Sequence, residues 1–246
     1  MLRDNIIHLS ERVQTILKQV VEEMVKQYQP LGILLVGSYA NGRPGPDSDL
    51  DVYIIVTNQD WRERGNYYVD GMEIEYFINP VRQIRAYFRK ESHLQPHSAH
   101  MLSTGIILYQ QDAIVETLVK EAQETLNNQP PLEGVELDLL QYAIDDLHKD
   151  LKNFQQKQDS VAYQITASRG LERIITGFLR YHRQYMEKST LLEEQLQELD
   201  PEFATLVRQV VEHHYNFEVY SSLVTYIQSL VGRRQSTWKL SGSLNL

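Results

Sequence analysis

The residues most suited to chemistry in this sequence lie between Gly37 and Asp51. Gly37 and Gly42 lack side chains, so a phosphate group can approach the backbone closely there, and Ser38 adds a hydroxyl donor. If a helix begins near Ser38, its free backbone N–H groups favour an anion. We therefore interpret this loop as a phosphate-binding segment.

Two carboxylates follow the loop. Asp49 and Asp51 are two residues apart, so on a β-strand their side chains point to the same face of the sheet. Neighbouring carboxylates repel each other unless a cation neutralises them, and Mg²⁺ prefers such oxygen ligands together with substrate phosphates. The pair is therefore a candidate Mg²⁺ site.

A third carboxylate is expected from a later acidic strand. Glu73 and Glu75 share one face by the same alternation, and each could complete the site if the two strands are adjacent. A phosphate-binding loop, a metal-binding pair and a third acid together favour two-metal phosphoryl or nucleotidyl transfer. The residue types alone leave Glu73 and Glu75 open as alternatives.

Short strands and tight turns are predicted to position these groups. Asp70-Gly71 separates two apolar runs and is typical of a two-residue hairpin, because both central turn positions need a positive φ. Apolar patterning predicts strands over 33–36, 50–56, 66–69, 72–78 and 105–109, and helices over 5–28, 80–91 and 112–127. Pro80 is expected in the first turn of its helix.

The second half of the chain is predicted to be helical. Periodicity predicts helices over about 135–157, 160–186, 189–199 and 201–231. The change follows Gln129 and two prolines, which we interpret as a linker. The sequence thus predicts an α/β (α+β) domain with a short mixed sheet in residues 1–129. An all-α helical bundle over 130–246 would bind the acceptor or a partner.

Composition excludes several classes of protein. The 246 residues carry a formal charge of −9, which argues against a protein that coats long nucleic acid. The chain has no cysteine, so disulfides and thiolate metal sites are excluded. No apolar stretch approaches the ~20 residues of a membrane span, so we expect no membrane partner and a cytoplasmic location.

The spacing of the motif resembles a known family. Gly-Ser at 37–38, ten further residues and Asp-Leu-Asp at 49–51 resemble the signature of the DNA polymerase beta-type nucleotidyltransferase superfamily. With the flanking strands and the acidic hairpin strand, the resemblance extends over about 1–128. The two-part organisation is similar to kanamycin, streptomycin and lincosamide nucleotidyltransferases and to minimal nucleotidyltransferases.

The resemblance implies a role for each motif residue. Gly37 and Ser38 would bind the triphosphate of a nucleotide, and Asp49 and Asp51 would contact it through two Mg²⁺ ions. The implied reaction moves a nucleoside monophosphate, expected to be AMP from ATP, to a hydroxyl group and releases pyrophosphate. Mg²⁺ is thus the expected cofactor and an NTP the co-substrate.

The third acid of this family usually lies in an apolar-acidic-apolar triplet. The triplet at 74–76 fits, which favours Glu75 over Glu73 as the third catalytic and metal-binding acid. Asn41 departs from the family pattern, where Arg or Lys is frequent, and this weakens the expected phosphate electrostatics. The base that takes the acceptor's proton stays open among Glu73, Glu75 and Glu172.

The acceptor itself is left open. A small hydroxyl-bearing molecule such as an aminoglycoside-like antibiotic is expected from the domain arrangement, and the acidic charge is compatible with a cationic acceptor. The alternatives are an antitoxin-like AMP-transferase that modifies a partner protein, and a non-catalytic NTP-sensing scaffold. A homodimer is also left open.

Other clusters are interpreted as structural. Three arginines of the helix over 80–91 favour a solvated face over phosphate steering: Arg82, Arg85 and Arg89. Three histidines favour a surface position over a zinc site: His93, His97 and His100. The run 169–185 favours a helix packed into the bundle over a ribonuclease motif, because Arg173 and His182 would lie on opposite faces of that helix.

Overall fold

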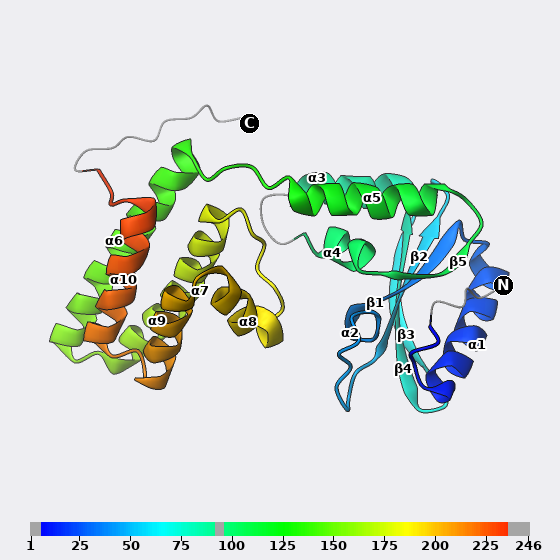
Figure 1. Ribbon diagram of the computed structural model, residues 1–246, viewed down its shortest axis with the longest axis horizontal. Coiled ribbons are helices and arrows are strands. Elements are labelled where there is room, and N and C mark those ends of the chain that lie inside the picture. The colour runs from blue at the N-terminus through cyan, green and yellow to red at the C-terminus, as the bar shows by residue number, and fades with distance from the viewer. Residues whose placement is uncertain (1–5, 92–95, 236–246) are drawn as a thin grey trace. The chain divides into compact units, whose positions relative to one another are not determined.

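The computed structural model describes residues 6–91 and 96–235 (Figure 1). The chain folds as two compact units, Met1–Gln129 and Pro130–Leu246. Buried apolar side chains form separate clusters in the two units. Within the described part of the chain, every helix is too short or too polar to cross a membrane.

The first unit is built on a five-stranded sheet with the strand order β3-β4-β2-β1-β5. β2 and β4 run parallel to each other, whereas the other neighbouring strands are antiparallel. The strands are β1 (Gly32–Val36), β2 (Leu50–Val56), β3 (Glu63–Val69), β4 (Met72–Pro80) and β5 (Ile106–Gln110). The predicted short mixed sheet is confirmed.

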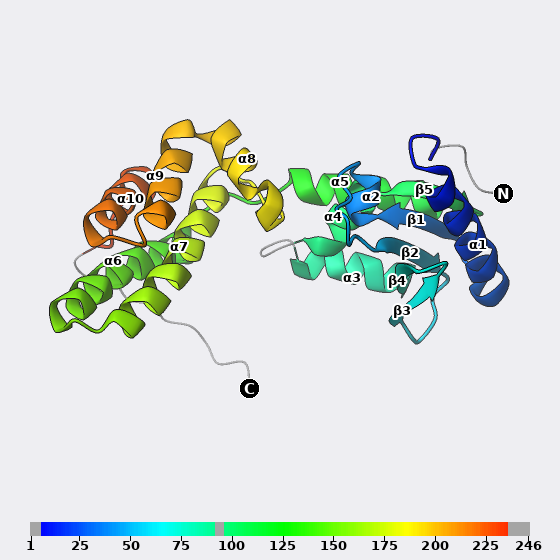
Figure 2. The ribbon, with the colours of Figure 1, turned by 90° about the horizontal axis from the view of Figure 1, so that it is seen from below.

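Helices cover both faces of this sheet (Figures 1 and 2). Side chains alternate along β2, so Val52 and Ile54 pack on the face of α1, whereas Tyr53 and Ile55 pack on the opposite face. The helices are α1 (Glu11–Tyr28) on the first face, and α3 (Val81–Glu91), α4 (His97–Ser103) and α5 (Ile114–Asn127) on the second. The sequence did not predict α4.

Local signals explain where several elements begin and end. Asp70 and Gly71 have φ values of 48° and 76°, which confirms the predicted hairpin between β3 and β4. Gln29 ends α1 in the left-handed region, directly before Pro30. Pro80 was predicted in the first turn of a helix, but it is the last residue of β4, and α3 begins one residue later.

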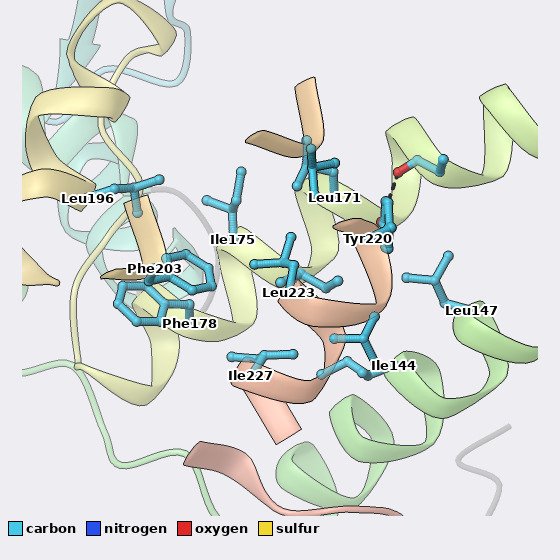
Figure 3. Packing of buried hydrophobic residues seen from close by; sticks show 14 of the residues in the cluster. Ile144, Leu147, Leu171, Ile175, Phe178, Leu196, Phe203, Tyr220, Leu223 and Ile227 are labelled. Carbon is cyan, nitrogen blue, oxygen red and sulfur yellow. Dashed lines mark hydrogen bonds between the residues drawn. The ribbon is translucent and has the colours of Figure 1, made fainter. Parts of the chain in front are cut away.

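The second unit is an all-α bundle, as predicted. Its helices are α6 (Gly134–Lys157), α7 (Ser160–Tyr181), α8 (Ser189–Leu199), α9 (Pro201–Glu212) and α10 (Phe217–Val231). Phe178 and Phe203 stack in its core with ring centroids 3.7 Å apart (Figure 3). The buried Tyr220 hydroxyl donates to the Ala167 carbonyl over 2.9 Å, so its polar atom is satisfied.

Three predicted helices are shorter than expected. The helix predicted over 5–28 begins only at Glu11, because the Ser10 side chain caps it by accepting a hydrogen bond from Val13 N. The segment over 201–231 contains two helices rather than one, because His214 and Tyr215 adopt φ values of 51° and 58° and Asn216 then caps α10. The helix predicted to reach residue 186 ends at Tyr181, and Arg183 has a φ of 56°. Residues 182–188 and 213–216 contain no glycine or proline, which is why the pattern missed both breaks.

Arg180 joins α7 to the start of the bundle from a buried position. Its Nε and Nη2 atoms donate to the two carboxylate oxygens of Glu136 over 2.8 and 2.6 Å, and Nη1 donates to the Pro130 carbonyl over 2.7 Å. Only 8% of the Arg180 side chain is exposed. The basic run on α7 therefore includes a buried structural arginine.

Candidate active site

Asp51 lies on β2, which is between β1 and β4 in the sheet. β2 pairs with β1 on one side, where Asp51 is opposite Val36, and with β4 on the other, where Asp51 is opposite Glu75. The loop that begins at Gly37 directly follows Val36. The sheet topology thus brings the predicted loop and the predicted third acid to the two sides of Asp51.

Three carboxylates meet at this point. Asp49, Asp51 and Glu75 each offer one oxygen, and these oxygens all lie within 4.8 Å of one another. All three side chains are partly exposed, so solutes can reach them. Among the residues that the structure describes, no other group of acids and histidines is close enough to hold a metal ion. We call these three residues the carboxylate cluster.

Gly37 allows the loop to approach the cluster. Its φ is +71°, and a β-carbon built on it would lie 2.0 Å from Asp51 Oδ2. The predicted helix at Ser38 is the single turn α2 (Gly37–Ala40), after which Arg43 N donates to the Ser38 carbonyl over 3.0 Å. Gly37 is buried and Ser38 is half-buried, so the loop lies directly beside Asp51.

Glu75 is paired with an arginine that sequence reasoning missed. Arg64 of β3 donates to Glu75 Oε1 from Nε over 2.9 Å and from Nη2 over 2.6 Å. Arg64 lies two residues from Asn66, the cross-strand partner of Glu75. The predicted outer strand began at residue 66, so Arg64 fell outside it, and its partner could only be assigned once the register was known.

Glu73 lies beside the cluster but does not belong to it. Its carboxylate accepts hydrogen bonds from Asn66 Nδ2 and from the Tyr68 hydroxyl, the latter over 3.2 Å. The bond to Glu73 raises the pKa of Tyr68 above its ordinary value. Glu172, the third candidate base, lies on the exposed side of α7 and is also not a member of the cluster.

The basic face of α3 is occupied by ion pairs. Arg82 pairs with Asp60 over 2.6 Å, and Arg85 binds Glu121 through two hydrogen bonds of 2.9 and 2.7 Å. The bond to Glu121 raises the pKa of Arg85. A hollow of about 530 Å³ lies here and is lined by Arg85, Phe88, Arg89, Glu121, Glu124, Thr125 and Asn128. None of these residues belongs to the carboxylate cluster.

The histidines do not contribute to a metal site in the described residues. His97 is exposed and His100 is half-buried, and both lie on α4. His93 lies outside the residues that the structure describes.

The carboxylate cluster fits a small divalent cation by its donor set. Its ligands are all oxygens, which hard cations such as Mg²⁺ prefer over nitrogen or sulfur. Oxygen ligands of one octahedral Mg²⁺ lie about 3–4 Å apart, because each is about 2 Å from the ion. The three oxygens of the cluster lie within 4.8 Å of one another, which approaches this spacing.

Comparison with known proteins agrees with this geometry. Residues 17–109 match the family model described as a nucleotidyltransferase domain. The crystal structure of a nucleotidyltransferase-like protein from Exiguobacterium sibiricum is similar, with a TM-score of 0.52 and 14% identity. The likeness covers 87% of this chain and 75% of that chain, and at this identity it shows the fold. No curated protein matches the sequence.

The matched segment contains β1, β2 and β4, and with them the loop at Gly37 and the whole carboxylate cluster. The family match supports a transferase, in agreement with the resemblance of the motif at 37–51. Within the N-terminal unit, residues 17–109 therefore form a nucleotidyltransferase domain.

Proposed function

We propose that this chain is a Mg²⁺-dependent nucleotidyltransferase that moves AMP from ATP to a hydroxyl group of a small molecule and releases pyrophosphate. The observation that carries the proposal is the meeting of Asp49, Asp51 and Glu75 beside the loop at Gly37. Oxygen ligands beside a glycine loop suit a triphosphate and its counter-ions.

The proposal gives each residue a task. The Ser38 hydroxyl and the backbone N–H groups of the turn at Gly37 bind the outer phosphates of the nucleotide. Asp49, Asp51 and Glu75 hold the divalent cations. When bound, the cations supply charge neutralisation for the triphosphate and activation of the acceptor hydroxyl. A base takes the proton that the hydroxyl loses.

An aminoglycoside-like molecule is the proposed acceptor. Glu73 and Glu75 are two residues apart on β4, so both acidic side chains lie on the same face of the sheet. Acidic side chains attract an acceptor that bears amino groups, and the formal charge of −9 acts in the same direction.

Transfer of label from ATP tests the proposal. The full chain is incubated with Mg²⁺, ATP labelled at its α-phosphate and a panel of aminoglycosides, lincosamides and other hydroxyl compounds. We expect labelled acceptor and pyrophosphate, both lost in Asp49→Asn and Asp51→Asn. Asp60→Asn removes the same charge from an exposed residue paired with Arg82 and should retain transfer.

Other outcomes would redirect the assignment. Label in a protein of a cell lysate, without labelled small molecule, would favour the antitoxin-like AMP-transferase. Binding of ATP with neither labelled acceptor nor pyrophosphate would favour an NTP-sensing scaffold. Transfer that persists after chelation of divalent ions with EDTA would contradict the proposed dependence on Mg²⁺.

A further inference from the structure

The two hydrogen bonds from Arg64 end on the same oxygen of Glu75. Nε lies 2.9 Å and Nη2 lies 2.6 Å from Oε1. A carboxylate oxygen has two lone pairs, so these bonds use the full accepting capacity of Oε1. In the described part of the chain, no hydrogen bond ends on Oε2. Glu75 therefore has one oxygen left for any further partner.

A stack of aromatic rings supports Arg64 in this position. Its guanidinium carbon lies 4.8 Å from the ring centroid of Phe77, its direct partner across the β3–β4 pair. Phe77 in turn stacks on Tyr53 with centroids 6.2 Å apart and an interplanar angle of 17°. Tyr53 is 2% exposed, so the stack is fixed in the core. Although 67% of the Arg64 side chain is exposed, the cation–π contact with Phe77 stabilises its position.

The number of oxygens that a carboxylate offers discriminates between divalent ions. Mg²⁺ requires near-octahedral geometry from single oxygens at short distance. Ca²⁺ is larger, accepts more ligands and commonly takes both oxygens of one carboxylate. A glutamate that offers only one oxygen therefore suits Mg²⁺, whereas the same glutamate with both oxygens available favours Ca²⁺.

We propose that Arg64 makes the carboxylate cluster selective for Mg²⁺ over Ca²⁺. Arg64 occupies Oε1 of Glu75 with two hydrogen bonds, so that Glu75 binds a cation through Oε2 alone. Arg64 acts through Glu75 and is a positioning residue. The inference rests on the proposed function, because it requires that the cluster bind a divalent ion.

Competition against Mn²⁺ measures the selectivity without any catalysis. Free Mn²⁺ is followed by electron paramagnetic resonance while Mg²⁺ or Ca²⁺ displaces it from the full-length protein. In Arg64→Ala we expect the affinity for Ca²⁺ relative to Mg²⁺ to rise about tenfold, a size typical for loss of a partner of a metal ligand. The ratio is decisive because loss of one positive charge strengthens the binding of both ions equally.

Two further variants separate geometry from charge. Arg64→Lys keeps the charge but cannot place two fixed donors on one oxygen, so its ratio should shift in the same direction. Arg82→Ala removes an exposed arginine whose partner is Asp60, and its ratio should stay that of the unmodified protein.

Each contrary result identifies what has failed. An unchanged ratio in Arg64→Ala or in Arg64→Lys, with Mn²⁺ still bound, would overturn the role of Arg64 and leave the proposed function standing. If the unmodified protein binds no Mn²⁺, the cluster is not a metal site, and both the inference and the metal-dependent function are overturned. Circular dichroism of each variant establishes that the fold is retained.

Discussion

The carboxylate of Asp51 lies where a side chain on Gly37 would have to be. A β-carbon on Gly37 would lie 2.0 Å from Asp51 Oδ2, and the backbone there has a φ of +71°. The same contact that brings the loop beside the carboxylate cluster thus excludes every residue except glycine from position 37.

Substitution of Gly37 should therefore be more damaging than substitution of a glycine that has a positive φ but no close neighbour. Gly42 has a φ of +68°, but a β-carbon there meets no atom within 4 Å. We expect Gly42→Ala to lower the free energy of unfolding by about 1–2 kcal/mol, the cost of a left-handed alanine. Gly37→Ala should cost more and abolish binding of a triphosphate. Urea unfolding and nucleotide titration check both, and equal effects of the two variants would contradict the contact.

The two acids of β4 should differ in their effect on transfer. Glu75→Gln removes a member of the carboxylate cluster, so we expect the rate to fall by about 10²–10⁴-fold. Glu73→Gln keeps an oxygen that can accept from Tyr68, and its rate should stay within about tenfold of the unmodified enzyme. Single-turnover rates with labelled ATP measure both. A larger loss in Glu73→Gln than in Glu75→Gln would reverse the assignment.

The buried Arg180 should contribute strongly to the stability of the bundle. Arg180→Ala leaves the Glu136 carboxylate and the Pro130 carbonyl without their donors, so the free energy of unfolding should fall by about 2–3 kcal/mol. Arg208 pairs with Glu193 at the surface, and Arg208→Ala should change the free energy of unfolding by less than about 1 kcal/mol. Urea unfolding of both variants provides the comparison.

His148 should make the protein less stable in mild acid. Burial lowers the pKa of His148, and Lys152 and Arg233 lower it further while Asp145 opposes them. The unfolded chain therefore binds this proton more readily than the folded one, and stability is lost as the pH falls below about 6.5. Unfolding free energies at about pH 7.5 and about pH 5.5 should differ less in His148→Gln. An identical difference in both proteins would contradict this role.

The sequence allowed the local elements of the sheet to be predicted, because their signals are short-range. Asp70-Gly71 carries its positive φ values in its residue types, and apolar runs mark the buried strands. Alternation placed Glu73 and Glu75 on one face but could not rank them. The structure ranks their proximity, since the parallel pairing of β2 and β4 puts Glu75 opposite Asp51.

Other features had no local signal. The break between α9 and α10 depends on positive φ values at His214 and Tyr215, which are neither glycine nor asparagine. The contact between Arg64 and Glu75 is diagonal across two strands, so it follows from register and side-chain direction rather than from sequence spacing. The burial of Arg180 likewise required knowledge of where Glu136 lies.

The pairing of β2 with β4 also determines where the chain tolerates changes in length. Residues 57–62 connect β2 to β3, so an insertion there leaves the pairing of Asp51 with Glu75 intact. One residue added or removed within the first part of β4 would instead shift the register and put Ile74 or Tyr76 opposite Asp51. Side chains alternate along a strand, so Glu75 would then point to the other face of the sheet. Length variation among natural relatives should therefore be found in the 57–62 connection and be excluded from the start of β4.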